Sequence, residues 1–252
     1  MNISELQNLV EKNYPIQHAN LDSIDWQDQS LPETIFQHCV FPRANFSTTT
    51  FSGARFNNCH FQECRFTNAD LRGASFTDCN FTHRTEKPTG VNFAGCDMRE
   101  SNFTQCDLNL ARFARCDLFS ITLQSCNLLG ASFEKSDFSH SYGRRAATTR
   151  ASFLACNLGL SNLADLRLPG CIFTASRLRE ADLAAIDLTG ADLRDCDLYG
   201  AILEKAKLDR ADLRGADLTG LNLLYLASYR QLKIDSSQQH HLLIALGLDI
   251  DP

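Results

Sequence analysis

The stretch ADLRGADLTG at residues 211–220 contains the same five-residue unit twice: a small residue, an acid, a leucine and two further residues. Working outward from it, a large apolar residue stands at every fifth position in three uninterrupted runs: Leu21 to Phe81, Phe93 to Phe138 and Phe153 to Leu223. A period of five matches neither the α-helix nor the alternation of a β-strand. The sequence therefore predicts a repeat architecture in which every unit returns one large side chain to the interior.

The position two residues before each large one is the second expected interior position, and it is usually small. All eleven cysteines lie there, so we expect buried, reduced thiols that fill space and bind no metal. The cysteines are Cys39, Cys59, Cys64, Cys79, Cys96, Cys106, Cys116, Cys126, Cys156, Cys171 and Cys196.

The repeated unit resembles the pentapeptide-repeat family over residues 19–223. This resemblance implies an all-β solenoid, a right-handed quadrilateral β-helix with four units in each turn. We expect three parts: an N-terminal cap over residues 1–18, the β-helix over 19–224, and a C-terminal helix and dimerisation segment over 225–252. Each coil of such a solenoid is stabilised by burial against its neighbours.

Both ends of the chain carry helix signals. Ser4 followed by Gln7 is a capping-box pattern, and it predicts a short N-terminal helix that closes the solenoid. Asp235 or Ser236 could cap a C-terminal helix over residues 237–246, with Gly247 as its C′ residue. Its apolar side chains exceed what a lid needs, and the segment resembles the tail through which Qnr-type quinolone-resistance proteins dimerise. The predicted dimerisation residues are Leu242, Leu243, Leu246 and Leu248.

Two insertions interrupt the repeat. Phe81 and Phe93 are twelve residues apart instead of five, and Phe138 and Phe153 are fifteen apart, so seven and ten residues are inserted. These segments, loop 1 (about 82–92) and loop 2 (about 139–151), resemble in placement the two projecting loops of Qnr-type proteins. Surface insertions are also tolerated without a function, because the cost of closing a loop grows slowly with its length. The predicted partner-binding residues are His83, Arg84, Glu86 and Lys87 in loop 1, and Tyr142, Arg144, Arg145 and Arg150 in loop 2.

The same resemblance implies a function. It predicts binding to DNA gyrase, with topoisomerase IV as a second candidate, and protection from topoisomerase poisons such as fluoroquinolones. An acidic rod could act by DNA mimicry, or the loops could reach the enzyme and displace the poison. A net charge of −6 over 252 residues is modest for a phosphate mimic and disfavours direct binding of nucleic acid, so we favour the loops. The alternative is an interaction scaffold, or an immunity protein against a peptide gyrase poison, without quinolone protection.

Other classes of protein find little support in the sequence. We expect no enzyme and no cofactor, because the sequence has no phosphate-binding glycine loop and no HExxH or GxSxG motif. It has no apolar run of membrane-spanning length and no signal-peptide pattern, so we expect a cytoplasmic protein without a membrane partner. The run of units before loop 1 is longer than a Qnr-type protein leads us to expect.

Overall fold

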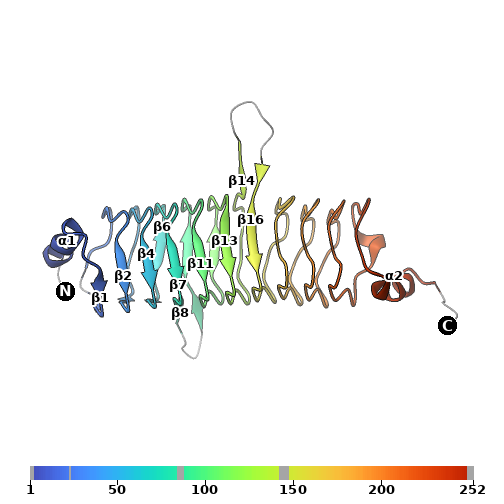
Figure 1. Cartoon of the computed structure of the whole chain (residues 1–252), viewed down its shortest axis with the longest axis horizontal. Helices are drawn as coiled ribbons and strands as arrows, with labels where there is room; N and C mark the ends of the chain where they lie inside the picture. The colour runs from blue at the N-terminus through green and yellow to red at the C-terminus, as the bar shows by residue number, and fades with distance from the viewer. Residues whose placement is uncertain (1–2, 23, 84–87, 142–147, 249–252) are drawn as a thin grey trace.

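The chain winds into a straight rod of stacked coils, with its two ends at opposite ends of the rod (Figure 1). The computed structural model describes residues 3–22, 24–83, 88–141 and 148–248. Strands of successive coils pair in parallel twenty residues apart, as in the register of Phe36 with Phe56. Because four units of five residues make each coil, the structure confirms the predicted β-helix solenoid.

The strands are short, and each sheet runs along one side of the rod. The largest sheet has the order β1-β2-β4-β7-β11-β13-β16. Its strands are Ile16–Gln17, Ile35–Gln37, Arg55–Asn57, Ser75–Thr77, Asn102–Thr104, Ile121–Gln124 and Ala151–Leu154. A second sheet contains β6 (Arg65–Thr67), β10 (Asn92–Ala94) and β12 (Arg112–Ala114), and a third pairs β3 (Val40–Pro42) with β5 (His60–Gln62). Isolated parallel bridges continue the ladders where the coils have no named strand.

Each coil has four faces, which we name after one large residue of an early coil: the Phe36, Phe41, Phe46 and Phe51 faces. On each face the large residues stack directly on one another. The rings of Phe36 and Phe56 lie 4.9 Å apart and nearly parallel, and those of Phe41 and Phe61 lie 4.8 Å apart. These spacings equal the separation of hydrogen-bonded strands, so backbone pairing and side-chain stacking satisfy the same repeat distance.

The corners between faces explain why the unit has five residues. In most units the second residue after the large one adopts a left-handed conformation, for example His38 with φ 53° and Asp78 with φ 53°. Such a φ disfavours residues other than glycine, but the N–H group at this position pairs with the next coil, as His38 N does with Asn57 O at 2.9 Å. The repeated Asp closes the turn, because Asp182 Oδ1 accepts the Ala184 N–H at 3.0 Å. The repeated carboxylates therefore have a structural role in the turn.

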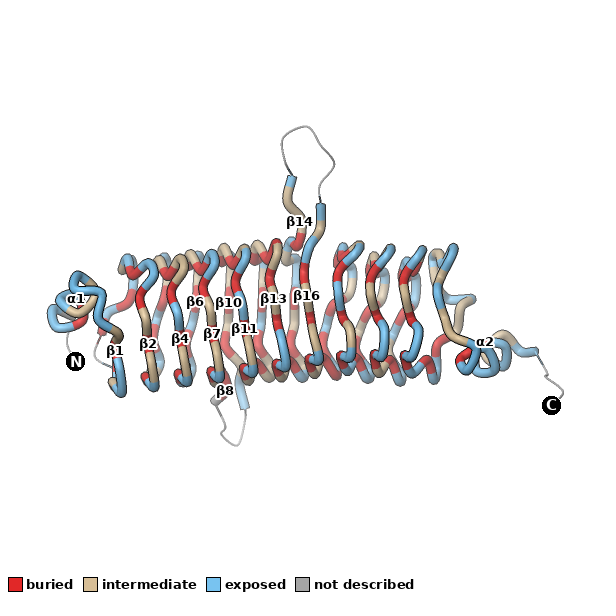
Figure 2. The backbone as a smooth tube through the Cα atoms, in the orientation of Figure 1, coloured by how far each residue is buried: buried red, intermediate tan, exposed pale blue. Residues whose placement is uncertain are grey.

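The interior of the coils is filled by the large and the small residue of each unit (Figure 2). All eleven cysteines are buried free thiols, as predicted. Several do more than fill space, since Cys79 Sγ donates to Phe56 O of the preceding coil at 3.3 Å. Ser176 Oγ makes the equivalent bond to Phe153 O at 2.8 Å. Burial raises the pKa of the Cys171 thiol to about 12, which keeps that thiol protonated.

Helix α1 (Ile3–Glu11) lies at the N-terminal end, where its Leu6 is fully buried against the core. The cap helix is therefore present, but the predicted N-cap is wrong, because Ser4 lies inside the helix. Coiling also starts earlier than the sequence count suggests. Ile16, in β1, is fully buried and takes the position of the large residue of a unit, paired with Phe36 of the next coil.

The C-terminal end departs from the strict count. Asp212 bridges to Lys233, where a strict repeat would pair it with Leu232, so one extra residue is accommodated in the last coil. The extra residue enters at the short helix η1 (Leu223–Tyr225), because Lys205 N already donates to Tyr225 O, one residue further along than the equivalent bond from Gly200 N to Thr219 O. The coil extends beyond the boundary expected at residue 224. Helix η2 (Ser236–Gln238) and helix α2 (Gln239–Ala245) then close the rod. Asp235 caps this segment, as predicted.

We expect Phe56→Ala to destabilise the protein by about 3–5 kcal/mol, because the ring is fully buried between two stacked neighbours. The loss should be local, since each coil contacts only its neighbours. Hydrogen exchange should show lost protection in the coils around residue 56 and little change near residues 183–213. Phe56→Leu is the control, with a smaller effect. Loss of protection along the whole rod would contradict this prediction.

Candidate functional site

Two antiparallel hairpins interrupt the parallel solenoid. In loop 1, β8 (Thr82–His83) pairs with β9 (Thr89–Gly90); in loop 2, β14 (Ser139–His140) pairs with β15 (Thr148–Thr149). Loop 1 leaves the rod after Phe81 of the Phe41 face, and loop 2 leaves after Phe138, which belongs to the Phe51 face. Since these faces are opposite, the loops project on opposite sides of the rod (Figure 1).

The coils close beneath both loops without loss of register. Phe66 pairs with Phe93 across loop 1, and Leu123 pairs with Phe153 across loop 2. Each of these offsets exceeds the usual twenty by the length of the insertion that the sequence predicts, seven for loop 1 and ten for loop 2. The rod therefore holds both hairpins at defined positions along its length.

Both loops leave the rod through the same polar contact. Asn80 Oδ1 accepts the N–H of Thr82 at 2.8 Å and its hydroxyl at 2.9 Å. Asp137 Oδ1 accepts the N–H of Ser139 at 2.9 Å and its hydroxyl at 2.7 Å. Each contact uses the repeat's own Asp or Asn position and adds a hydroxyl residue after the large side chain. The first residue of each loop is thereby tied to the coil that it leaves.

The root of loop 1 is also joined to a row of side chains on the Phe41 face. The Thr82 hydroxyl lies 3.3 Å from Asp107 Oδ2 of the next coil. Asn127 Nδ2 donates to Asp107 Oδ1 at 3.0 Å, and Asn157 Nδ2 donates to Asn127 Oδ1 at 3.1 Å. These bonds link the loop root to three successive coils, so the rod supports the hairpin beyond its own turn.

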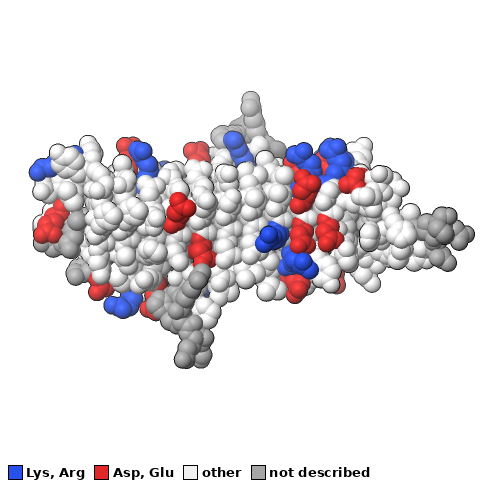
Figure 3. Space-filling model, turned by 60° about the horizontal axis from the view of Figure 1, so that its bottom comes forward, with Lys and Arg blue, Asp and Glu red and all other residues white. Residues whose placement is uncertain are grey.

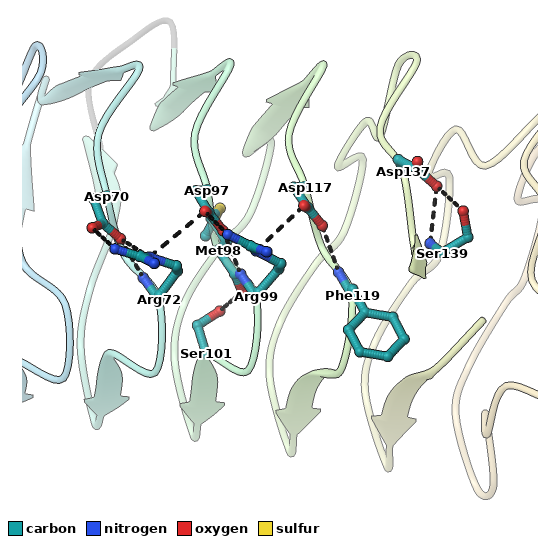
Figure 4. A network of polar contacts seen from close by, with 10 residues as sticks. All are labelled: Asp70, Arg72, Asp97, Met98, Arg99, Ser101, Asp117, Phe119, Asp137 and Ser139. Carbon is teal, nitrogen blue, oxygen red and sulfur yellow. Dashed lines mark hydrogen bonds and ion pairs between the residues drawn. The ribbon is translucent and has the colours of Figure 1, made fainter. Parts of the chain in front are cut away.

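A charged row runs along the Phe51 face toward loop 2 (Figure 4). Arg72 pairs with Asp70 at 2.6 Å and reaches Asp97 of the next coil at 3.7 Å. Arg99 repeats the arrangement between Asp97 and Asp117, at 3.4 Å from the latter. The hydrogen bond from Arg72 lowers the pKa of Asp70 below its ordinary value. Two arginines thus neutralise part of the acidic row.

The pattern changes at the foot of loop 2. Phe119 and Ser139 occupy the positions that arginines occupy in the two preceding coils, and among the described residues no arginine joins Asp117 to Asp137 (Figure 4). Burial raises the pKa of Asp117 above its ordinary value, and the nearby carboxylates of Asp97 and Asp137 act in the same direction. At the foot of loop 2, fewer arginines therefore face the carboxylates than in the rest of this row.

A groove of about 470 Å³ opens between the coils beside this point. Phe138 lines the groove, and its charged residues are Glu134, Lys135, Asp137, Asp165 and Arg167. Its charges are mixed, and the groove forms where the coil of Phe138 gives rise to loop 2. In the part of the chain that the structure describes, no three His, Cys, Asp or Glu side chains are placed so that they could hold a metal ion.

The comparison with known proteins agrees with this geometry. A family model for pentapeptide repeats matches residues 44–82, 89–124, 156–195 and 191–223, with eight copies. The chain belongs to the pentapeptide-repeat family. A search of curated protein sequences finds no match for this pentapeptide-repeat protein.

Among solved structures, the chain is similar to QnrB1, described as a plasmid-mediated fluoroquinolone resistance protein. One trypsin-treated form aligns with a TM-score of 0.68 at 20% identity, covering 94% of this chain and 99% of that chain. Full-length QnrB1 aligns with a TM-score of 0.58 at 23% identity, covering 87% of this chain and 98% of that chain. At this identity the likeness shows a shared fold.

The predicted loop residues fall mostly outside the part of the chain that the structure describes. This holds for Arg84, Glu86 and Lys87 of loop 1 and for Tyr142, Arg144 and Arg145 of loop 2. His83 belongs to strand β8, so its backbone is placed at the root of loop 1. Arg150 is exposed where loop 2 rejoins the rod, and its carbonyl accepts the Ser120 N–H at 2.7 Å.

The four predicted dimerisation leucines have different environments. Leu242 is 5% exposed and packs into the core of its own chain, which gives it a sealing role within the protomer. Leu243 and Leu248 are exposed and Leu246 is half-buried. The sequence analysis missed Ile244, which is 53% exposed on the same short helix. The outward apolar surface of α2 is therefore formed by residues other than Leu242.

The sequence analysis missed two further residues, one at the C-terminal end of the rod and one at the end of loop 1. Gln238 is buried and donates to Leu213 O and Ala216 O, each at 2.7 Å, which fixes the helical segment onto the last coil. Gly90 ends loop 1, and a Cβ there would lie 2.3 Å from the carbonyl carbon of Leu110. Its position immediately before the resumed repeat was the signal that could have identified it.

We expect Gly90→Ala to displace the end of loop 1, because the added methyl group would meet backbone atoms that cannot move aside. Overpacking of this kind typically costs about 1–3 kcal/mol. Thermal unfolding should occur at a lower temperature, and hydrogen exchange should accelerate in β9 and β10. Thr89→Ala, an exposed change in the same strand, is the control. Wild-type exchange in the Gly90 variant would show that the close approach is unimportant.

Proposed function

We propose that the protein binds DNA gyrase and protects it from topoisomerase poisons such as fluoroquinolones, with topoisomerase IV as a second target. The observation that carries this proposal is the pair of hairpins held at fixed positions on opposite faces of a rod that resembles QnrB1. Rigid scaffolds commonly carry their binding residues on such loops. The partner-binding residues would be His83, Arg84, Glu86 and Lys87 in the first loop, and Tyr142, Arg144, Arg145 and Arg150 in the second.

The charges on the rod favour action through the loops over DNA mimicry. Many repeat carboxylates accept backbone N–H groups, and Asp192 and Asp212 also pair with Arg194 and Arg214 at 2.6 and 2.7 Å. In the view of Figure 3, acidic and basic side chains are interspersed. A duplex mimic needs a continuous row of unpaired negative charge, and paired carboxylates supply less of it.

We further propose a homodimer formed through the C-terminal segment. Leu243, Ile244 and Leu248 expose apolar side chains at the end of the rod, and Leu246 is half-buried beside them. Apolar surface of this kind is commonly buried against a partner. A second copy meeting this end would extend the rod, with two loops on each protomer.

The proposed function is tested by gyrase supercoiling in the presence of ciprofloxacin, titrated with the purified protein. We expect supercoiling to recover with wild-type protein. Deleting residues 83–89 removes seven residues, and deleting 140–149 removes ten, so each deletion restores the five-residue register. We expect the loop deletions to lower protection at least tenfold while the β-helical circular dichroism remains unchanged.

The outcomes of this experiment distinguish gyrase protection through the loops from the alternative functions. Full protection by both deletion variants would rule out action through the loops. Failure of the wild-type protein against ciprofloxacin, with recovery against a peptide gyrase poison, would favour the immunity alternative. Failure against both would leave an interaction scaffold that does not protect gyrase.

The dimer is tested by replacing residues that face outward. We expect Ile244→Arg with Leu248→Arg to yield monomers in light scattering, because two charges would be buried at the interface. Leu242→Ala is the control: it should lower thermal stability, since Leu242 packs within its own chain, and leave the dimer intact. A dimer that persists in the double-arginine variant would place the interface elsewhere.

A further inference from the structure

We propose that three leucines on the Phe41 face form a docking surface for an apolar segment of the protein partner. Leu110, Leu129 and Leu160, here called the leucine strip, lie on the first, second and third coils after the root of loop 1; Leu110 is half-buried and the other two are exposed. The segment that fits it carries apolar side chains and a carboxylate placed opposite Arg177. The inference rests on the proposed function, because gyrase is the protein taken to carry this segment.

The leucines lie over glycines of the following coil. A Cβ on Gly130 would be 2.8 Å from Leu110 Cδ2, and a Cβ on Gly159 would be 3.2 Å from Leu129 Cδ1. Leu160 follows in the third coil and is 59% exposed. Because Gly130 and Gly159 have no side chain, Leu110 and Leu129 can lie against the rod. The strip therefore presents apolar side-chain carbon atoms to a partner.

The fold does not require leucine at these positions. Outward residues one and two places after the large residue are mostly polar elsewhere, as with Arg72 and Arg99 on the opposite face. Single exposed leucines are ordinary on protein surfaces. Two exposed leucines and the half-buried Leu110 on adjacent coils of one face, with glycines beside two of them, offer more apolar surface than a single leucine, and a partner can bury it.

The polar groups around the strip carry little free charge. Asp107 accepts hydrogen bonds from Asn127 and from the loop root at Thr82, and Asn157 extends this row as a neutral amide. Figure 3 brings this side of the rod forward, and the described residues there show no charged side chain from the right of loop 1 to a mixed charged group nearer the C-terminal end. An apolar partner surface therefore meets a smaller desolvation penalty here than it would over unpaired charges.

The charged residues beyond Leu160 decide which partner fits. Arg179 pairs with Asp197 at 3.5 Å and lies over the Tyr199 ring, 4.6 Å from its centroid. Glu180 is exposed nearby, whereas Arg177 makes no ion pair among the described residues. Arg177 also lines a groove of about 480 Å³ with Asn127 and Asn157, beside the strip. Charge complementarity therefore calls for a carboxylate at this end of the partner segment.

The test is binding of the full-length protein to reconstituted gyrase, measured by biolayer interferometry. We expect Leu129→Asp and Leu160→Asp each to weaken binding about tenfold or more, as for residues at the centre of an interface. Leu160 has φ 56°, a conformation that Asp tolerates, so the fold should be kept. Arg177→Glu should also weaken binding, because it would repel the partner's carboxylate.

Ile172→Asp is the matched control. Ile172 is 37% exposed against 36% for Leu129, lies on the Phe36 face, and precedes Asp192 in its column of repeats. We expect it to bind gyrase within about twofold of wild type. An equal loss in the control would show that added negative charge alone weakens binding, and would overturn the proposal.

Different outcomes would contradict the proposed function and the docking role of the leucine strip. Wild-type affinity in both leucine variants, with binding lost on deletion of residues 83–89, would remove the strip and leave the loops as the contact. Wild-type affinity in Arg177→Glu would show that the partner segment places no carboxylate opposite Arg177. Absence of gyrase binding by the wild-type protein would overturn the proposed function, and the strip with it.

Discussion

The rest of the structure depends on the coincidence of two spacings along the rod axis. Backbone hydrogen bonds hold neighbouring coils one strand separation apart, and stacked aromatic rings such as Phe36 and Phe56 prefer nearly the same distance, here 4.9 Å. Each coil can therefore bury its large side chains directly on those of the previous coil. The requirement leaves no freedom in register, because a slip of one residue would exchange interior and exterior positions along a whole face.

The same constraint leaves the exterior free. Outward positions lie outside the stacked core, so Arg72, Arg99, Phe119 and Ser139 can occupy equivalent places on successive coils with different consequences (Figure 4). Insertions are tolerated at a corner provided that the register resumes, as it does at Phe93 and Phe153. A protein built in this way can acquire loops and surface strips without altering its core, and its partners are selected by the exterior alone.

Residues whose role follows from the repeat count were predictable from the sequence. The interior positions, the buried thiols, the lengths of both insertions and the cap at Asp235 agree with the structure. Residues whose role depends on a neighbouring coil were not predictable in this way. Ser4 lies within a helix instead of before it, Leu242 faces inward, and Thr82 bonds a carboxylate of the next coil.

The sequence by itself determined the repeat, because a period of five returns one large side chain to the interior in each unit, and the resemblance of that unit to pentapeptide repeats implied the solenoid. It also determined where the coiling is interrupted. Tertiary structure alone decided that the loops project from opposite faces, that Gly90 passes within contact of Leu110, and that Leu110 and Leu129 lie beside glycines of the following coils. These features join residues of different coils, and their positions depend on how many residues each coil contains, which no single unit encodes.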